Sequence, residues 1–274
     1  GMKKVAAQIV AMGKGSFRAV MLEGGLPGEG WDMKSRLELD GKMEGEEATI
    51  GQEGSLYQGK VAAGIFAGET KAGERFSLMK TERKSPTMGA KAPEGAIVLF
   101  DGENTDQLTD AKVGGHKMLF AGAKTKRAFG DFKLHAEFLV PFMPTGKMES
   151  RGNSGIYIQE RYEIQILDSF GQRMAANECG GVYRQIAPKV NMSFPPLVWQ
   201  TFDIDFQSAK WEGEKKMKNA VVSVRHNGVL VHDRVEIKNK TGQGKAEGPE
   251  PLPIYFQFHG DPIYFRNLWL VEMR

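Results

Sequence analysis

Apolar and polar residues alternate in short runs along much of this chain, and a period of two predicts β-strands. The clearest run is 132–138, FKLHAEF, in which apolar residues alternate with Lys133, His135 and Glu137. No long segment has helical periodicity, so the expected fold class is all-β. Other strands are expected at 97–100, 199–206, 221–226, 229–232, 254–259 and 263–271.

The strength of this alternation changes along the chain. Residues 4–80 alternate weakly, and residues 84–95, KSPTMGAKAPEG, carry prolines and glycines that are typical of a linker. We therefore expect a small N-terminal β unit over residues 1–90 and a β-sandwich over residues 96–274. The first unit has few large apolar residues, so we expect it to dock on the sandwich. The candidate contacts are Trp31, Leu37, Leu39, Phe66 and Phe76.

The stretch 153–171, NSGIYIQERYEIQILDSFG, carries the most chemistry. Tyr162, Ile164 and Ile166 define one face of a strand. Glu163 and Gln165 fall between them and share the opposite face, roughly 7 Å apart. An acid and an amide in register predict the floor of a polar cleft.

Asp168 and His259 complete the candidate catalytic set with Glu163. Asp168 is out of phase with Glu163, and a bulge after Gln165 would bring the three side chains to one face. Asp168 could instead cap the turn that follows it. His259 precedes a Gly-Asp-Pro turn and could be a proton donor, a metal ligand or a hydrogen-bonded edge histidine. We expect Glu163, Gln165 and His259 on one concave face.

Several further side chains are suited to sugar hydroxyls, because carboxylates and amides form directional hydrogen bonds and aromatic rings stack on sugars. Each tryptophan could equally be a core residue. Arg266 lies in an apolar strand and needs an acid partner, for which Glu163, Glu137 and Asp168 are the candidates. The candidate substrate-binding residues are Glu137, Asn153, Gln159, Arg161, Gln165, Tyr183, Trp199, Gln257 and Arg266.

Composition excludes several classes. The net charge is only +3 and no dense basic tract occurs, so nucleic-acid binding is not indicated. No apolar run is long enough for a membrane span. The single Cys179 excludes an internal disulfide, and the spacing of the histidines does not predict a dedicated zinc site. Gly1 before Met2 resembles a tag-cleavage scar, so we expect any signal peptide to be missing from this sequence.

A series of motifs makes the chain recognisable. They are LFDG at 99–102, GDFKLHAEF at 130–138, RGNSGIYIQERYEIQILDSFG at 151–171, GGVYRQIAP at 180–188, WQTFDIDF at 199–206, VRHNGVLVHD at 224–233 and HGDPIYFRNLWL at 259–270. Together they closely resemble the 3-keto-disaccharide hydrolase family, long called domain of unknown function 1080. The resemblance implies a concanavalin-like β-sandwich (jelly roll), action on sugars oxidised at carbon 3, and a bacterial protein that is periplasmic or secreted. Glu160 and Phe258 depart from the family, which usually has Gly and often Asp at these positions.

The resemblance also implies a reaction. A ketone at carbon 3 acidifies the hydrogen on carbon 2, so a base can remove it and the glycosidic oxygen leaves by β-elimination, after which water adds. This route needs a base, a group that stabilises the enolate and an acid. A divalent cation could polarise the ketone, with Glu163, Asp168, Gln165 and His259 as its candidate ligands, but the sequence establishes neither a metal nor which residue is the base. The alternatives are a non-catalytic carbohydrate-binding module, and an interaction domain whose groove is covered by the N-terminal unit.

Overall fold

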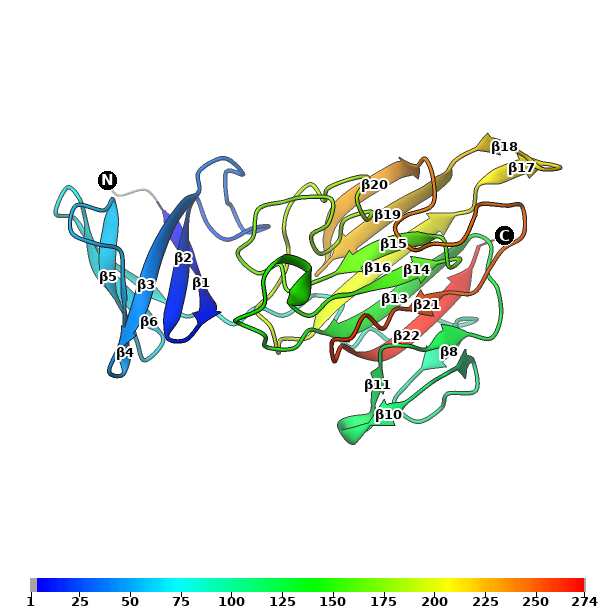
Figure 1. Ribbon diagram of the computed structural model, residues 1–274, viewed down its shortest axis with the longest axis horizontal. Coiled ribbons are helices and arrows are strands. Elements are labelled where there is room, and N and C mark those ends of the chain that lie inside the picture. The colour runs from blue at the N-terminus through cyan, green and yellow to red at the C-terminus, as the bar shows by residue number, and fades with distance from the viewer. Residues whose placement is uncertain (1–3, 274) are drawn as a thin grey trace. The chain divides into compact units, whose positions relative to one another are not determined.

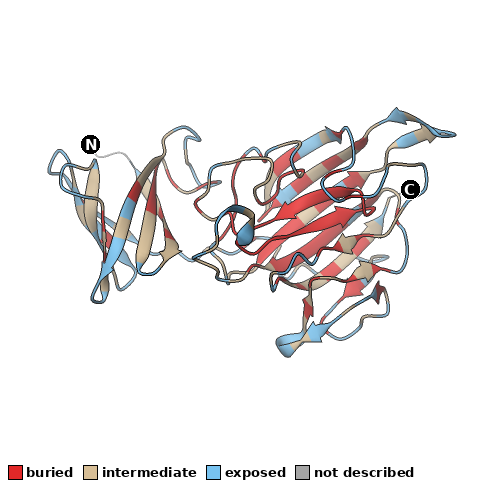
Figure 2. Ribbon diagram, viewed as in Figure 1, coloured by how far each residue is buried: buried red, intermediate tan, exposed pale blue. Residues whose placement is uncertain are grey.

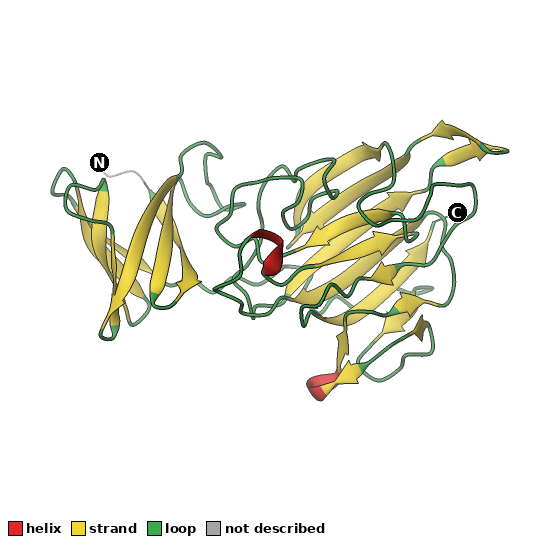
Figure 3. Ribbon diagram, in the orientation of Figure 1, coloured by secondary structure: helices red, strands yellow, loops and turns green. Residues whose placement is uncertain are grey.

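The computed structural model describes residues 4–273, and the chain divides into two units at Arg83 and Lys84 (Figure 1). Gly1 and Met2, the expected tag scar, lie outside the described residues. The all-β prediction is confirmed (Figure 3). Helical structure in residues 4–273 is limited to two short 3-10 helices, Gly115–Lys117 and Met148–Ser150.

The first unit is one antiparallel meander of seven strands that pair in chain order. The strands are β1 (Val5–Gly13), β2 (Ser16–Glu23), β3 (Leu37–Glu44), β4 (Glu47–Ile50), β5 (Tyr57–Ala62), β6 (Ile65–Thr70) and β7 (Arg75–Met79). Leu39, Phe66 and Phe76 are buried within the core of this unit. The prediction that these three residues dock on the sandwich is therefore wrong, because the meander uses them in a core of its own.

The second unit contains two main sheets and a small hairpin. The large sheet has the order β10-β11-β22-β13-β16-β19-β20, with β8 also paired to β22. Its strands are β8 (Ile97–Phe100), β10 (Val113–Gly114), β11 (Met118–Phe120), β13 (Phe132–Leu139), β16 (Gln200–Gln207), β19 (Ala220–His226), β20 (Val229–Ile237) and β22 (Tyr264–Glu272). The hairpin is β17 (Lys210–Glu212) with β18 (Lys215–Lys218).

The small sheet has the order β15-β14-β21-β12-β9. Its strands are β9 (Leu108–Thr109), β12 (Lys124–Thr125), β14 (Ser154–Ile158), β15 (Tyr162–Ile166) and β21 (Tyr255–Phe256). All of its strand pairs are antiparallel. Figure 2 shows that β14 and β15, at one edge of this sheet, are buried along their whole length.

One hydrophobic core lies between the two sheets and makes the unit a sandwich. Leu134 and Phe138 of β13 and Ile164 of β15 belong to the same buried cluster. Alternate residues of each strand point to opposite faces, so Glu137 of β13 and Glu163 of β15 both point away from this core. Because the sheets face one another across the core, the two acids lie on opposite outer faces of the sandwich.

The segment expected to be a linker is attached to the large sheet. Ser85 Oγ lies 2.6 Å from Thr201 Oγ1, and Thr87 Oγ1 donates a hydrogen bond of 2.7 Å to Asp203. The backbone N–H of Gly89 donates a hydrogen bond of 2.6 Å to Glu137. Residues 85–90 thus form a strap over β13 and β16, and the division between the units comes before it. The strap contains one proline, Pro86, and one glycine, Gly89, and its hydrogen bonds hold it to the sheet.

Candidate active site

The outward face of the small sheet carries three neighbouring rows of polar side chains. In the hairpin β14–β15, Tyr157 is paired with Glu163 and Gly155 with Gln165. Tyr157 is also paired with Tyr255 of β21. Gln257, just beyond β21, donates its backbone N–H to Gly155 O at 2.8 Å, which places it beside Gly155. The register therefore brings groups from three strands to one place.

Gly155 makes room for the Glu163 side chain at the centre of this face. A Cβ atom at residue 155 would lie 2.5 Å from Glu163 Oε1 and 2.7 Å from Glu163 Cγ. Such distances are far below van der Waals contact, so no larger residue fits without moving Glu163. Glycine at this position lets the carboxyl group lie flat across β14.

The environment of Glu163 favours a protonated carboxyl group at unusually high pH. Glu163 is only 3% exposed. This burial raises its pKa to about 7, and the nearby Glu149 adds to the rise, whereas the Tyr157 hydroxyl and the charge of Arg184 oppose it. Burial, with the charge of Glu163, also raises the pKa of Tyr157 above its usual range. Near neutral pH the site thus holds a carboxyl group that can accept a proton and a phenol that keeps its own.

Amide side chains connect Glu163 to the loop that follows β21. In the orientation that satisfies both of its ends, the Gln165 amide donates to Glu163 Oε1 at 3.1 Å and to Ser154 O at 2.7 Å. The next residue along this face is Asn153, whose Nδ2 lies 3.4 Å from His259 Nδ1. Glu163 and Gln165 are thus joined directly, whereas the printed contact of His259 is with Asn153, so the grouping of His259 with Glu163 stays a prediction. His259 itself is exposed.

Gln257 has an unused hydrogen-bonding atom at this place. Its Oε1 is buried and has no hydrogen-bond partner among residues 4–273. A buried carbonyl oxygen without a donor is costly, by about 1–3 kcal/mol. A bound water or a ligand hydroxyl would satisfy it, which suits a site that holds a polyhydroxylated molecule.

Asp168 is occupied by an ion pair. Its Oδ2 accepts a hydrogen bond of 2.7 Å from Nη2 of Arg151, and Oδ1 accepts one from the Phe170 backbone. Burial raises the pKa of Asp168, and Arg151 opposes the rise. The expected bulge is absent from the β14–β15 pairing, since the register is regular until β15 ends at Ile166. Asp168 thus follows the alternative given above, capping the next turn, and its carboxylate is not free beside Glu163.

Three other predicted substrate-binding residues hold loops in place. Gln159 Nε2 donates to Phe129 O at 2.8 Å, and Arg161 Nε donates to Ala246 O at 2.8 Å. Tyr183 donates its hydroxyl to Glu149 at 3.0 Å and its backbone N–H to Glu163 O at 3.0 Å. Tyr183 therefore borders the Glu163 site, while Gln159 and Arg161 anchor the end of the hairpin.

Glu137, Trp199 and Arg266 belong to the other side of the sandwich, so the sequence was wrong to group them with Glu163. Arg266 Nε donates to Glu137 Oε2 at 2.6 Å, and its guanidinium lies 4.0 Å from the centre of the Trp199 ring. Of the three acid partners considered for Arg266, Glu137 is the one found. Burial alone would raise the pKa of Glu137, but hydrogen bonds lower it to about 2. The donors are Arg266 Nε at 2.6 Å, Asn267 Nδ2 at 2.9 Å and the Gly89 N–H at 2.6 Å, while His135 Nε2 lies 3.7 Å away.

Sequence reasoning missed Tyr157 and Glu149. Tyr157 reads as one of several β-forming residues, and only the hairpin register shows that it lies opposite Glu163. The register could have been derived from the turn at 159–160, since a two-residue hairpin loop fixes the pairing. Glu149 lies in the short 3-10 helix before β14, and no pattern in the sequence connects it to the site.

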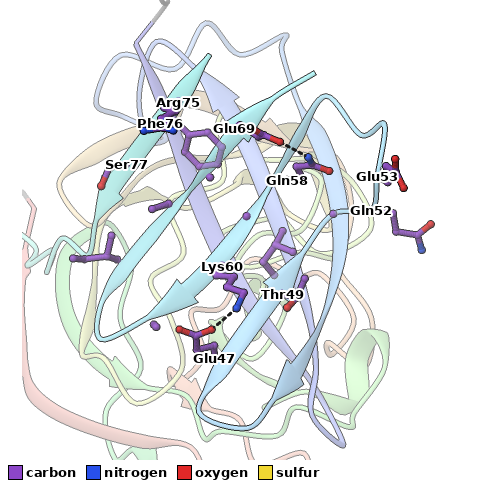
Figure 4. A pocket seen from close by; sticks show the side chains of 17 residues that line it. Glu47, Thr49, Gln52, Glu53, Gln58, Lys60, Glu69, Arg75, Phe76 and Ser77 are labelled. Atoms are coloured by element: carbon purple, nitrogen blue, oxygen red, sulfur yellow. Dashed lines mark hydrogen bonds and ion pairs between the residues drawn. The ribbon is translucent and has the colours of Figure 1, made fainter. Parts of the chain in front are cut away.

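Two hollows of the surface lie elsewhere. One of about 1060 Å³ lies on strands β4 to β7 of the first unit, where Lys60 contacts Glu47 and Gln58 contacts Glu69 (Figure 4). Another of about 540 Å³ lies on the outer face of the large sheet. Neither is lined by a residue that the sequence predicted for the site. We place the site on the small sheet because it holds the buried Glu163, whose pKa is raised, and the buried Gln257 Oε1, which has no hydrogen-bond partner among residues 4–273.

Residues 4–273 contain no group of three or more His, Cys, Asp and Glu side chains arranged to hold a metal ion. Near the site, Asp168 is paired with Arg151, and His259 contacts the Asn153 amide. Within the same range, no helix is long and apolar enough to cross a membrane.

Comparison with known proteins fits this arrangement. Residues 29–271 match the family described as a 3-keto-alpha-glucoside-1,2-lyase-like domain. The chain belongs to this family. The resemblance drawn from the motifs is confirmed, and the match begins well before residue 96, where the motifs placed its start. No curated protein matches the chain.

One solved structure supports a carbohydrate-active family. A crystal structure of a "putative glycosyl hydrolase" from Parabacteroides distasonis is 32% identical to this chain, with a TM-score of 0.61, and covers 66% of this chain and 85% of its own. Another protein of that description and organism is 15% identical with a TM-score of 0.49, over 66% of this chain and 95% of its own. The chain is thus a β-sandwich member of a carbohydrate-active family.

Proposed function

We propose that this protein cleaves 3-keto-glycosides, with Glu163 as the base that removes the hydrogen from carbon 2. The observation that carries the proposal is the buried Glu163 carboxyl group, whose pKa of about 7 suits a base at neutral pH. A carboxylate with its usual pKa would be a weaker base. The family description supports a keto-sugar substrate.

Neighbouring groups supply the other roles of the elimination. Tyr157 stays protonated near neutral pH, so its hydroxyl can donate to the enolate oxygen or to the leaving glycosidic oxygen. Gln257 Oε1 and the Gln165 amide can hydrogen-bond sugar hydroxyls. His259 contacts Asn153 and is exposed, so it would contact the part of the substrate that extends toward solvent.

The test is turnover of synthetic 3-keto-glucosides beside their unoxidised parents, with and without a chelator, by the wild type and by Glu163→Gln. The substitution keeps the shape and removes the negative charge. We expect turnover of the keto-glucosides only, and a loss of about 10²- to 10⁴-fold in Glu163→Gln. A folded Glu163→Gln protein with full turnover would exclude Glu163 as the base. Loss of activity with the chelator would show that a divalent cation takes part.

A non-catalytic carbohydrate-binding module is the second candidate. The low exposure of Glu163 favours this candidate, because a base must touch its substrate. A module could instead bind a sugar through exposed residues such as His259, without any contact to Glu163. This function predicts binding of a 3-keto-glucoside, measured by calorimetry, with no product under any condition. It also predicts that Glu163→Gln leaves the affinity nearly unchanged.

A further inference from the structure

The turn of the β14–β15 hairpin holds a carboxylate in a conformation that favours glycine. Gln159 and Glu160 have φ angles of 52° and 48°, as a type I′ turn requires at both central residues. A non-glycine residue in this left-handed region costs roughly 1–2 kcal/mol. Glu160 stands there nonetheless, with its side chain only 9% exposed.

The Glu160 carboxylate joins three separate segments of the chain. Its Oε1 lies 2.6 Å from Lys124 Nζ on β12, and its Oε2 lies 2.6 Å from Lys245 Nζ on the loop 239–250. The backbone N–H of Lys245 also donates to Glu160 O at 2.8 Å. The side chain thus compensates for its strained backbone by holding two lysines that nothing else in the hairpin joins.

The loop that Lys245 belongs to lies directly against the candidate base. Thr241 Oγ1 accepts the Glu163 backbone N–H at 2.7 Å, and the Gln243 N–H donates to the Tyr157 hydroxyl at 3.3 Å. A Cβ on Gly242 would lie 3.1 Å from that hydroxyl. The loop therefore fixes where the Tyr157 hydroxyl lies and helps to keep water from Glu163.

We propose that Glu160 is a positioning residue: its carboxylate holds Lys245, and through it the loop 239–250, against Tyr157 and Glu163. The positioning role rests on the function proposed above. Other contacts hold the remainder of the loop, since Arg161 binds Ala246 O and Glu250 O and Tyr162 binds Glu247. Loss of the Glu160 carboxylate should therefore loosen residues 241–245 without unfolding the loop.

The test uses Glu160→Gly, which removes the carboxylate and also relieves the positive φ, so the turn and the fold should be retained. We expect the Gln243 and Gly244 amides to exchange with deuterium about tenfold faster, since their protection depends on the closed loop. We also expect kcat for a 3-keto-glucoside to fall about tenfold, with KM changed by less than about twofold, because a misplaced Tyr157 affects the transition state more than binding.

Two further variants make the result specific. Lys245→Met removes the same ion pair without changing the turn, and it should reproduce both effects. Glu47→Gln removes an ion pair of 2.7 Å with Lys60 in the first unit, and it should change neither. Wild-type exchange rates in folded Glu160→Gly would show that the Glu160 carboxylate does not hold the loop 239–250. Faster exchange with unchanged kcat would show that this contact does not position Tyr157 for the reaction. If the wild type turns over no keto-glucoside, the proposed function fails, while the exchange rates still decide whether Glu160 holds the loop.

Discussion

Tyr157 on β14 lies directly opposite Glu163 on β15, and its hydroxyl lowers the pKa of the Glu163 carboxyl group. A phenol is a hydrogen-bond donor, so its presence favours the ionised form of Glu163 against the burial that opposes it. The pair thus combines a base that titrates near neutral pH with a proton donor that does not. Their strand register, and not their spacing in the sequence, creates this combination.

The pH dependence of turnover should follow this pair. Glu163 must be ionised to act as a base, so kcat/KM for a 3-keto-glucoside should rise through an apparent pKa of about 7. Tyr157→Phe removes the hydroxyl that lowers the Glu163 pKa, and it should therefore move this rise to higher pH. Tyr255→Phe, on the neighbouring strand of the same row, should leave the pH of the rise unchanged. A rise centred near pH 4.5 in the wild type would contradict the assignment.

Stability should depend on the ionisation of Glu163. Its pKa is raised from 4.5 in the unfolded chain to about 7 in the folded protein. The corresponding stabilisation, roughly 3 kcal/mol, is present below pH 4.5 and is lost as the pH rises through 7. Denaturant titrations between pH 4 and 8 should show the wild type losing stability relative to Glu163→Gln, which has no such ionisation. Parallel curves for the two proteins would show that Glu163 is not buried in solution.

The space at Gly155 gives a third prediction. Gly155→Ala places a Cβ where Glu163 Oε1 and Cγ lie, so the Glu163 side chain must leave its position or β14 must shift. We expect turnover to fall at least about tenfold, since small displacements of a catalytic group are costly. Gly130→Ala is the matched control, because a Cβ at residue 130 meets nothing within 4 Å. Equal turnover in the two alanine variants would remove Gly155 from the site.

Alternation in the sequence identified strands and their faces but not the sheet to which each strand belongs. Glu137 and Glu163 both stand between apolar residues, so both were assigned to one groove, yet their strands lie in different sheets. A period of two shows only which side chains of a strand face the core and which face away from it. Strand partners depend on long-range packing, which the sequence pattern does not contain.

Turns and connections show the same limit. The Asn227–Gly228 turn was predictable from its residue types, and both residues have positive φ. The Gln159–Glu160 turn has the same backbone form but lacks such residues, because its stabilisation comes from lysines distant in the sequence. The strap at 85–90 was similarly hidden, since its anchors on the large sheet come from residues more than forty positions away.

The last prediction separates the two acidic faces of the sandwich. Glu137 is 1% exposed and binds the half-exposed Arg266 and the strap, so Glu137→Gln should destabilise the protein by about 1–3 kcal/mol, the cost of leaving buried hydrogen-bonding groups unpaired. The Glu137 pKa is lowered from 4.5 to about 2, so its stabilisation is present above pH 4.5 and is lost as the pH falls toward 2.

At neutral pH, Glu137→Gln should therefore have a lower midpoint in denaturant but an unchanged kcat/KM per folded molecule. The opposite pattern is expected for Glu163→Gln, which should be inactive and at least as stable as the wild type at pH 8. The comparison requires both variants on the same 3-keto-glucoside, with the folded fraction measured by circular dichroism. A loss of turnover in fully folded Glu137→Gln would return Glu137 to the substrate site, because only a direct or transmitted effect on the reaction could then explain it.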